Sequence, residues 1–151
     1  MKRVFTIIVL WVVMLLFCAP SFAALTGEQA HEKYIYPIVR VSANGEVGSG
    51  SIIYSKLNGT DKYSTYILTN YHVIGDAISI SEEWDSDLQK NIKKEKRAIV
   101  YVEIFKYRDV STPIGTLRVE ADVVIYNRTE DMALLKLRTE DKAQYTANLP
   151  P

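Results

Sequence analysis

The sequence predicts an all-β domain. From Tyr34 onward, short runs rich in Val, Ile, Tyr and Thr are separated by Gly, Asn, Asp and Pro, the composition of strands joined by turns. The chain has 151 residues, of which 48% are hydrophobic and 24% charged. This balance is typical of one globular domain with one core and excludes a disordered or fibrous chain.

Residues 1–23 have the features of a secretory signal peptide. Lys2 and Arg3 precede an apolar run over 4–17, and Ser21-Phe22-Ala23 supplies the small residues that signal peptidases require. Pro20 and this small-residue cluster favour cleavage after Ala23. The alternative is an uncleaved membrane anchor, because the apolar character continues to Leu25 and approaches the length of about 20 residues that spans a bilayer.

Cleavage would remove the two leader cations and the only cysteine, Cys18, leaving 16 basic against 18 acidic residues and a formal charge of −2. This charge does not favour binding to nucleic acid or to anionic lipid. Lipid attachment at Cys18 is not expected, because the preceding Phe17 is bulky. A mature chain without cysteine has no disulfide, thiol nucleophile or zinc–cysteine site, and we expect no cofactor. The expected location is secreted or periplasmic, in a bacterial envelope.

Six strands are expected, at 35–42, 47–54, 63–69, 98–107, 117–126 and 132–137. Asn44-Gly45 between the first two favours a tight hairpin turn. Residues 24–33 are expected to form a short, polar, weakly helical segment, 34–138 the domain, and 139–151 a polar linker. One helical turn is expected over 73–77, followed by extended structure over 77–81. The charged stretch 82–97 is expected to be a solvated loop or helix face.

His72 is a candidate general base. It lies within ILTNYHVI (67–74), just after the strand expected at 63–69, and histidine is the side chain that exchanges protons most readily near neutral pH. Asp131, at the start of an apolar strand, is a carboxylate that could orient the imidazole. The alternatives are a core or surface histidine and a turn aspartate. His31, among charged neighbours, is expected to be a surface residue.

Three segments together carry a family resemblance: GSGSII (48–53), LTNYHV (68–73) and DMALLKL (131–137). In this order they resemble the trypsin-like serine proteases of the chymotrypsin superfamily, particularly the disulfide-free bacterial HtrA/Deg-type branch. The resemblance covers Ile35–Arg138 and implies a six-stranded antiparallel barrel, the first half of a two-barrel fold. It also implies that His72 is the general base and Asp131 its orienting carboxylate.

The chain departs from that family in its serines. No serine follows Asp131, and the last one, Ser111, has no Gly-rich turn around it. Ser49 and Ser51 stand where the family places structural residues. The interval between His72 and Asp131 is long and is expected to contain an insertion within the barrel.

The leading interpretation is the N-terminal half of a secreted or periplasmic trypsin-like serine endopeptidase, inactive alone. Its partner would be a polypeptide substrate, once a serine-bearing second barrel completes the site. No nucleic acid and no stable membrane association after signal cleavage are expected. The alternatives are a non-catalytic, protease-derived binding or regulatory module, and half of a split protease completed by a second chain.

Overall fold

A computed structural model describes residues 26–59, 61–110 and 112–147. The predicted signal peptide, residues 1–23, and the last residues of the predicted linker lie outside the described residues. In the described ranges no helix is both long and apolar enough to cross a membrane.

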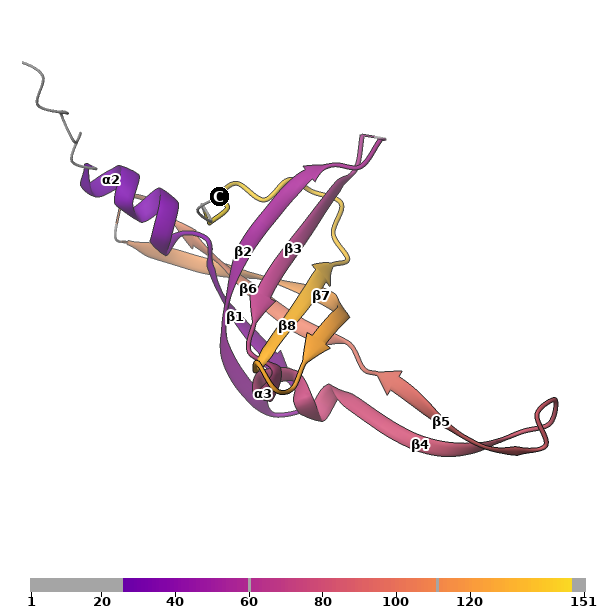
Figure 1. The fold of residues 1–151 in the computed structure, drawn as a ribbon. Helices are drawn as coiled ribbons and strands as arrows, with labels where there is room; N and C mark the ends of the chain where they lie inside the picture. Colours follow the sequence, from indigo (N-terminus) through magenta and orange to yellow (C-terminus); the bar gives the residue numbers. More distant parts are fainter. Residues whose placement is uncertain (1–25, 60, 111, 148–151) are drawn as a thin grey trace, which may run out of the picture.

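Six antiparallel strands form a closed barrel (Figure 1), which confirms the predicted fold class. Around the barrel they follow the order β1-β2-β3-β8-β7-β6, so that β1 pairs with β6 to close it. Their bounds are β1 (Ile38–Ala43), β2 (Glu46–Leu57), β3 (Tyr63–Thr69), β6 (Val100–Tyr107), β7 (Pro113–Asn127) and β8 (Met132–Leu137).

The barrel interior is filled by alternate residues of these strands. In β8, Ala133, Leu135 and Leu137 are buried, whereas the residues between them are partly exposed. The period of two is what a strand with one face on the core requires. The interior side chains of the other strands are mostly Val, Ile and Ala, and the largest include Val39, Val41, Ile52, Ile67, Val100 and Val102.

The predicted turn at Asn44-Gly45 is confirmed. Both residues have positive φ, 47° and 99°, which is the conformation of the two-residue hairpin turns that match strand twist. β-Bulges then coil the longer strands: the pairing of β2 with β3 skips Ile53, and the pairing of β7 with β8 skips Val124.

A short helical segment precedes the barrel. It consists of α2 (Gly27–Ala30) and the π-helical turn η1 (His31–Ile35), and a capping box between Thr26 and Gln29 starts it. The weakly helical character expected for 24–33 therefore extends to Ile35. The first strand begins at Ile38 rather than at residue 35, because the helical turn includes Ile35 and Pro37 follows it.

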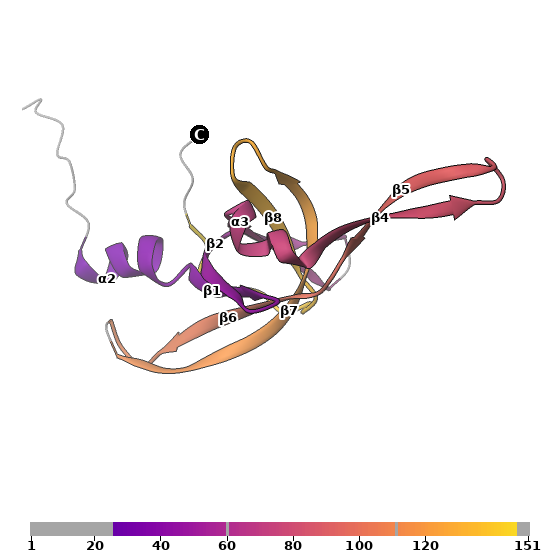
Figure 2. The ribbon, with the colours of Figure 1, turned by 90° about the horizontal axis from the view of Figure 1, so that it is seen from below.

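The expectation of a loop or helix over 82–97 is wrong. This stretch belongs to a two-stranded hairpin, β4 (Ile78–Asp85) and β5 (Lys90–Arg97), which is separate from the barrel sheet and projects away from it (Figures 1 and 2). Opposite charges face each other across the strands: Glu83 contacts Lys94 at 3.2 Å and Lys96 at 2.5 Å. The insertion thus lies outside the barrel.

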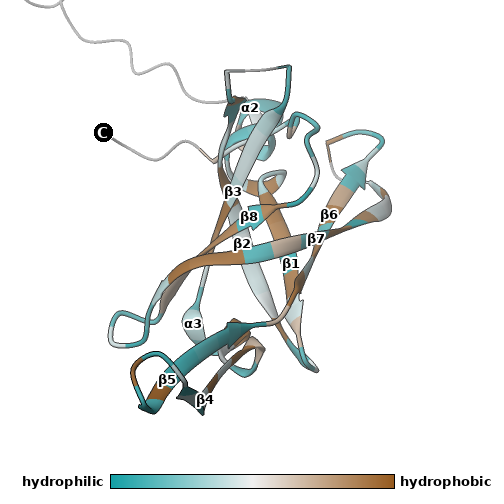
Figure 3. Cartoon of the chain, turned by 90° about the vertical axis from the view of Figure 1, so that its right-hand side faces the viewer, coloured by the Kyte–Doolittle hydropathy of each residue, from teal (hydrophilic) through white to brown (hydrophobic). Residues whose placement is uncertain are grey.

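This hairpin was hard to predict because it buries little. β5 is drawn mostly in hydrophilic colours (Figure 3), and six of its eight residues are charged. Only Ile92 of β5 is shielded to any extent, so the strand lacks the apolar alternation that identifies strands in sequences.

One helical turn was expected over 73–77, and the structure has two short ones that begin earlier: α3 (Tyr71–Ile74) and the 3-10 turn η2 (Gly75–Ala77). Val73 and Ile74 of α3 are buried in the core. Val73 packs directly over Gly48 of β2, where an added Cβ would overlap with the Val73 side chain. Gly48 is therefore needed for α3 to lie close to the sheet.

We expect Gly48→Ala to lower the free energy of unfolding by about 1–3 kcal/mol, because the β-branched Val73 has little freedom to move away. Urea unfolding measures the loss, and Val73→Ala in the same chain should recover part of it. Gly75→Ala is the matched control: its Cβ would lie 3.6 Å from the Tyr71 ring, an ordinary contact, with a helical φ of −55°. Equal destabilisation by the two alanines would contradict this packing argument.

Candidate functional site

The pairing of β3 with β8 brings His72 and Asp131 together. Thr69, the last residue of β3, lies opposite Ala133 near the start of β8. The residues that follow β3 are therefore next to those that precede β8, although 59 positions separate His72 from Asp131. Both predicted site residues lie at this one end of the barrel.

The backbone around Asp131 places its carboxylate. The turn from β7 to β8 is held by the Asn127 side chain, whose Oδ1 accepts the backbone N–H groups of Thr129 and Glu130. Asp131 ends the turn with φ of 50°, a left-handed conformation that aspartate tolerates better than most residues. Asp131 is thus a turn residue, and its side chain faces His72.

The carboxylate of Asp131 holds His72 at two points. Its Oδ1 accepts the backbone N–H of His72 at 2.9 Å, and its Oδ2 lies 2.7 Å from the imidazole Nδ1. Asn70 adds a third contact, because its amide nitrogen donates to the backbone carbonyl of Asp131 at 3.1 Å and to Oδ2 at 3.2 Å. The imidazole is therefore fixed through both its own ring and the backbone that carries it.

These hydrogen bonds determine the protonation of the pair. The backbone N–H of His72, and then its imidazole, hold the pKa of Asp131 below the usual range, against a smaller opposing effect of desolvation. An ionised carboxylate only accepts hydrogen bonds, so Nδ1 of a neutral His72 carries the proton. Nε2 then has a free lone pair, and 71% of the His72 side-chain surface is exposed. The site can accept a proton from an external group.

The glycine motif of β2 supports this geometry from beneath. Gly48 accommodates Val73 of α3, and an added Cβ at Gly50 would come within 3.0 Å of the Leu68 carbonyl and 2.9 Å of Ile67. Between them, the Ser49 carbonyl accepts the Thr69 hydroxyl at 2.8 Å. The glycines therefore allow the close approach of β3 and of α3, the element that carries His72.

Aromatic and basic residues flank the pair, and the sequence analysis missed them. The rings of Tyr71 and Tyr126 lie 5.3 Å apart, and Arg128 lies over both. The Tyr126 hydroxyl donates to Glu95 of the hairpin at 2.7 Å, which raises the pKa of Tyr126 and lowers that of Glu95. No spacing in the sequence relates Glu95 to Tyr126; only the position of Tyr71 beside His72 was available as a signal.

The other polar candidates lie apart from the pair. His31 Nδ1 contacts the Gly27 carbonyl at 2.8 Å within the N-terminal helix. Neither Ser49 nor Ser51, both within the described part of the chain, hydrogen-bonds to His72. Over the same described ranges, no group of three His, Cys, Asp or Glu side chains is placed to hold a metal ion.

A cavity of about 730 Å³ lies away from the pair. It is bounded by the N-terminal helix, the β6–β7 ribbon and the segment after β8, and its aromatic lining includes Tyr36, Phe105 and Tyr145. His72 and Asp131 are not among the residues that line it. His72 and Asp131 therefore lie on an open surface and outside this cavity.

No family model and no curated protein matches the chain. Among solved structures, the crystal structure of Deg5 is similar to this chain, with 18% sequence identity and a TM-score of 0.49. The match covers 80% of this chain and 46% of that one, so this chain spans about half the length of the matched structure. Similarity at this level establishes neither a family nor an activity.

We expect the carboxyl group of Asp131 to titrate below the ordinary range of aspartate in a carbon-detected NMR titration. His72→Ala removes the imidazole contact and keeps the backbone N–H, so the pKa of Asp131 should rise only part of the way. Asp122, whose pKa is lowered by Arg138, is the internal control and should not change.

The same group makes stability depend on pH. Because its folded pKa is depressed, Asp131 stabilises the protein fully above about pH 4, the range of an unfolded aspartate. This contribution is lost as the pH falls through the lower pKa of the folded state. An Asp131 that titrates normally in the wild-type protein would contradict the two-point contact.

Proposed function

We propose that this chain provides the base half of a serine endopeptidase, in which His72 is the general base and Asp131 orients it. The observation that carries the proposal is the two-point contact of the Asp131 carboxylate, which fixes the Nδ1–H tautomer and leaves Nε2 available. The substrate is a peptide bond of a polypeptide. The nucleophile is a serine of a second barrel that packs against this one.

The proposed reaction has two steps, acylation and deacylation, and His72 is the proton acceptor in both. Nε2 of His72 takes the proton of the attacking serine hydroxyl as its oxygen bonds to the peptide carbonyl carbon. The resulting imidazolium gives this proton to the leaving amine, and the C–N bond breaks. Water then repeats the sequence on the acyl-enzyme, releasing the acid and restoring the serine. Asp131 stays ionised throughout and stabilises the imidazolium.

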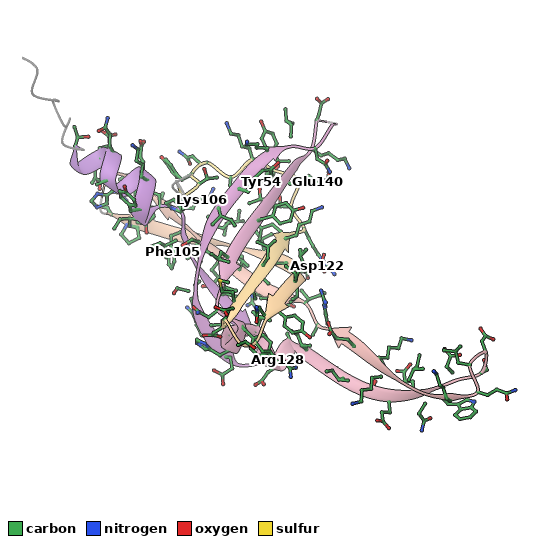
Figure 4. All side chains as sticks on the ribbon, viewed as in Figure 1. Tyr54, Phe105, Lys106, Asp122, Arg128 and Glu140 are labelled. Atoms are coloured by element: carbon green, nitrogen blue, oxygen red, sulfur yellow. The ribbon has the colours of Figure 1, made fainter. Side chains whose placement is uncertain are left out.

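The outer face of β3 and β8 is suited to such a second barrel. Tyr66, Leu68 and Leu134 point away from the interior and are only half-buried. Tyr54 of β2, labelled in Figure 4, extends this face and stacks edge-on against Tyr66 at a ring distance of 5.7 Å. A partner that covered these side chains would bury apolar surface next to the end of the barrel that carries His72.

A binding or regulatory module is the second candidate. It is favoured by the bond from the His72 backbone N–H to Asp131, because this contact holds α3 in place whatever the imidazole does. In that case Asp131 matters for stability alone. The two candidates differ in whether loss of the His72 side chain has any effect on a reaction.

The proposal includes export: the leader is cleaved after Ala23 and the mature chain resides outside the cytoplasm without stable membrane association. Its support is the order of charged, apolar and small residues in the leader. Amino-terminal sequencing of the natural protein tests it, with Ala24 as the expected first residue. A first residue at or near Met1, with the chain in the membrane fraction, would favour the anchor instead.

The activity is tested on the natural protein purified with the polypeptides it associates with. We expect a fluorophosphonate probe to label a serine in the assembly, and His72→Ala to reduce labelling and peptide hydrolysis by roughly 10⁴-fold or more. His31→Ala is the matched control, since His31 is the other histidine of the chain and contacts only the N-terminal helix and Tyr36.

Asp131→Asn should lower hydrolysis by a comparable factor, because the amide can hold the wrong tautomer. This chain purified alone should not hydrolyse peptides. Absence of a labelled serine in the assembly would refute the peptidase proposal and favour the module. Hydrolysis by the isolated chain that depends on His72 would refute the need for a second barrel.

A further inference from the structure

Arg128 is held over two tyrosine rings next to the proposed base. Its guanidinium carbon lies 5.2 Å from the ring centre of Tyr71 and 5.9 Å from that of Tyr126. Tyr71 is half-buried and packs against the core, so the ring beneath Arg128 is held in place. Figure 4 shows Arg128 at the end of the barrel where α3 lies.

The hydrogen-bond donors of Arg128 are unused within the described part of the chain. No side chain there forms an ion pair with it, and among those residues only its backbone carbonyl is hydrogen-bonded, to the N–H of Asp131. Stacking occupies the face of a guanidinium and leaves its in-plane N–H groups available for a carboxylate. Arg128 therefore presents a preoriented cationic fork to solvent.

Arg97, whose guanidinium carbon lies 5.6 Å from the ring centre of Tyr126, differs in this respect. Its Nε donates to Glu95 at 2.6 Å, and its Nη1 donates to the carbonyls of Val123 and Val124 at 2.8 and 2.7 Å. Glu95 also accepts the Tyr126 hydroxyl. The nearby carboxylate of Glu95 is thus bonded to Arg97 and Tyr126, and its interaction with Arg128 is a longer-range charge attraction and not an ion pair.

Arg128 is linked to His72 through Tyr71 and to Asp131 through the β7–β8 turn. It stacks on Tyr71, the residue before His72, and it belongs to the turn that ends at Asp131, whose N–H donates to the Arg128 carbonyl at 3.4 Å. A polypeptide bound against the exposed imidazole would lie at the same end of the barrel as Arg128. An acidic side chain on that polypeptide would meet an unpaired cation.

We propose that Arg128 is a specificity residue that binds an aspartate or glutamate side chain of the polypeptide presented to His72. The proposal rests on the proposed function for the identity of the reaction, but the recognition itself is a binding property of this chain. Because the pair would be solvent-exposed, the selectivity should be modest and should weaken with salt.

The test is a titration of the isotope-labelled protein with two blocked five-residue peptides that differ only at the centre, glutamate in one and glutamine in the other, flanked by alanines. We expect the glutamate peptide to bind about 3- to 10-fold more tightly at low salt. Shifts should appear at the side-chain N–H of Arg128 and at the Tyr71 ring. Arg128→Ala should abolish the difference between the peptides, and Arg128→Lys should retain only part of it.

Arg118→Ala is the matched control, because Arg118 also lies over a tyrosine, 4.0 Å from the Tyr101 ring, on a part of β7 paired with β6. It should leave the difference intact. Equal binding of the two peptides, binding of neither at millimolar concentration, or equal effects of the two alanine variants overturns the proposal. If the natural assembly prefers the glutamate peptide but hydrolyses no peptide, the peptidase function is refuted and the Arg128 binding site is retained.

Discussion

The site depends on one pairing, that of β3 with β8. These strands are not neighbours in the sequence, and closure of the barrel through β1 and β6 makes them neighbours in space. The register that sets Thr69 opposite Ala133 also sets the end of β3 beside the β7–β8 turn. A shift by one residue would turn Leu135 out of the core and move Asp131 away from His72. Core packing and site geometry are therefore secured by the same contacts.

The Asp131 carboxylate has two roles that are usually divided between residues. By accepting the His72 backbone N–H it fixes the start of α3, where the Asn70 side chain makes no capping bond to the helix and bonds to Asp131 instead. By accepting the imidazole it sets the tautomer. Because both oxygens are used, the carboxylate has little freedom to rotate. The remaining edge of the imidazole is exposed to solvent.

Sequence reasoning predicted the parts of the fold that bury a repeating pattern. β3 and β8 were placed at their observed bounds because each is a short run of β-forming or apolar residues between polar residues, and the Asn-Gly turn because few residues accept its backbone angles. His72 and Asp131 were found through motifs. The hairpin was missed because its strands are paired by charge with both faces in water, and Arg128 because its partners Tyr71 and Tyr126 come together only through the β-sheet.

The hairpin and the site are joined through one aromatic pair, which gives the insertion a structural link to His72. Arg97 supplies donors to the carbonyls of Val123 and Val124, at the place where the bulge interrupts the pairing of β7 with β8. Glu95 then holds the Tyr126 hydroxyl, and the Tyr126 ring supports Tyr71. A two-stranded ribbon has little stability of its own, so these contacts at its base determine how the arm leaves the barrel. A partner bound along the β4–β5 hairpin could consequently shift Tyr126 and, through it, the Tyr71 ring next to His72.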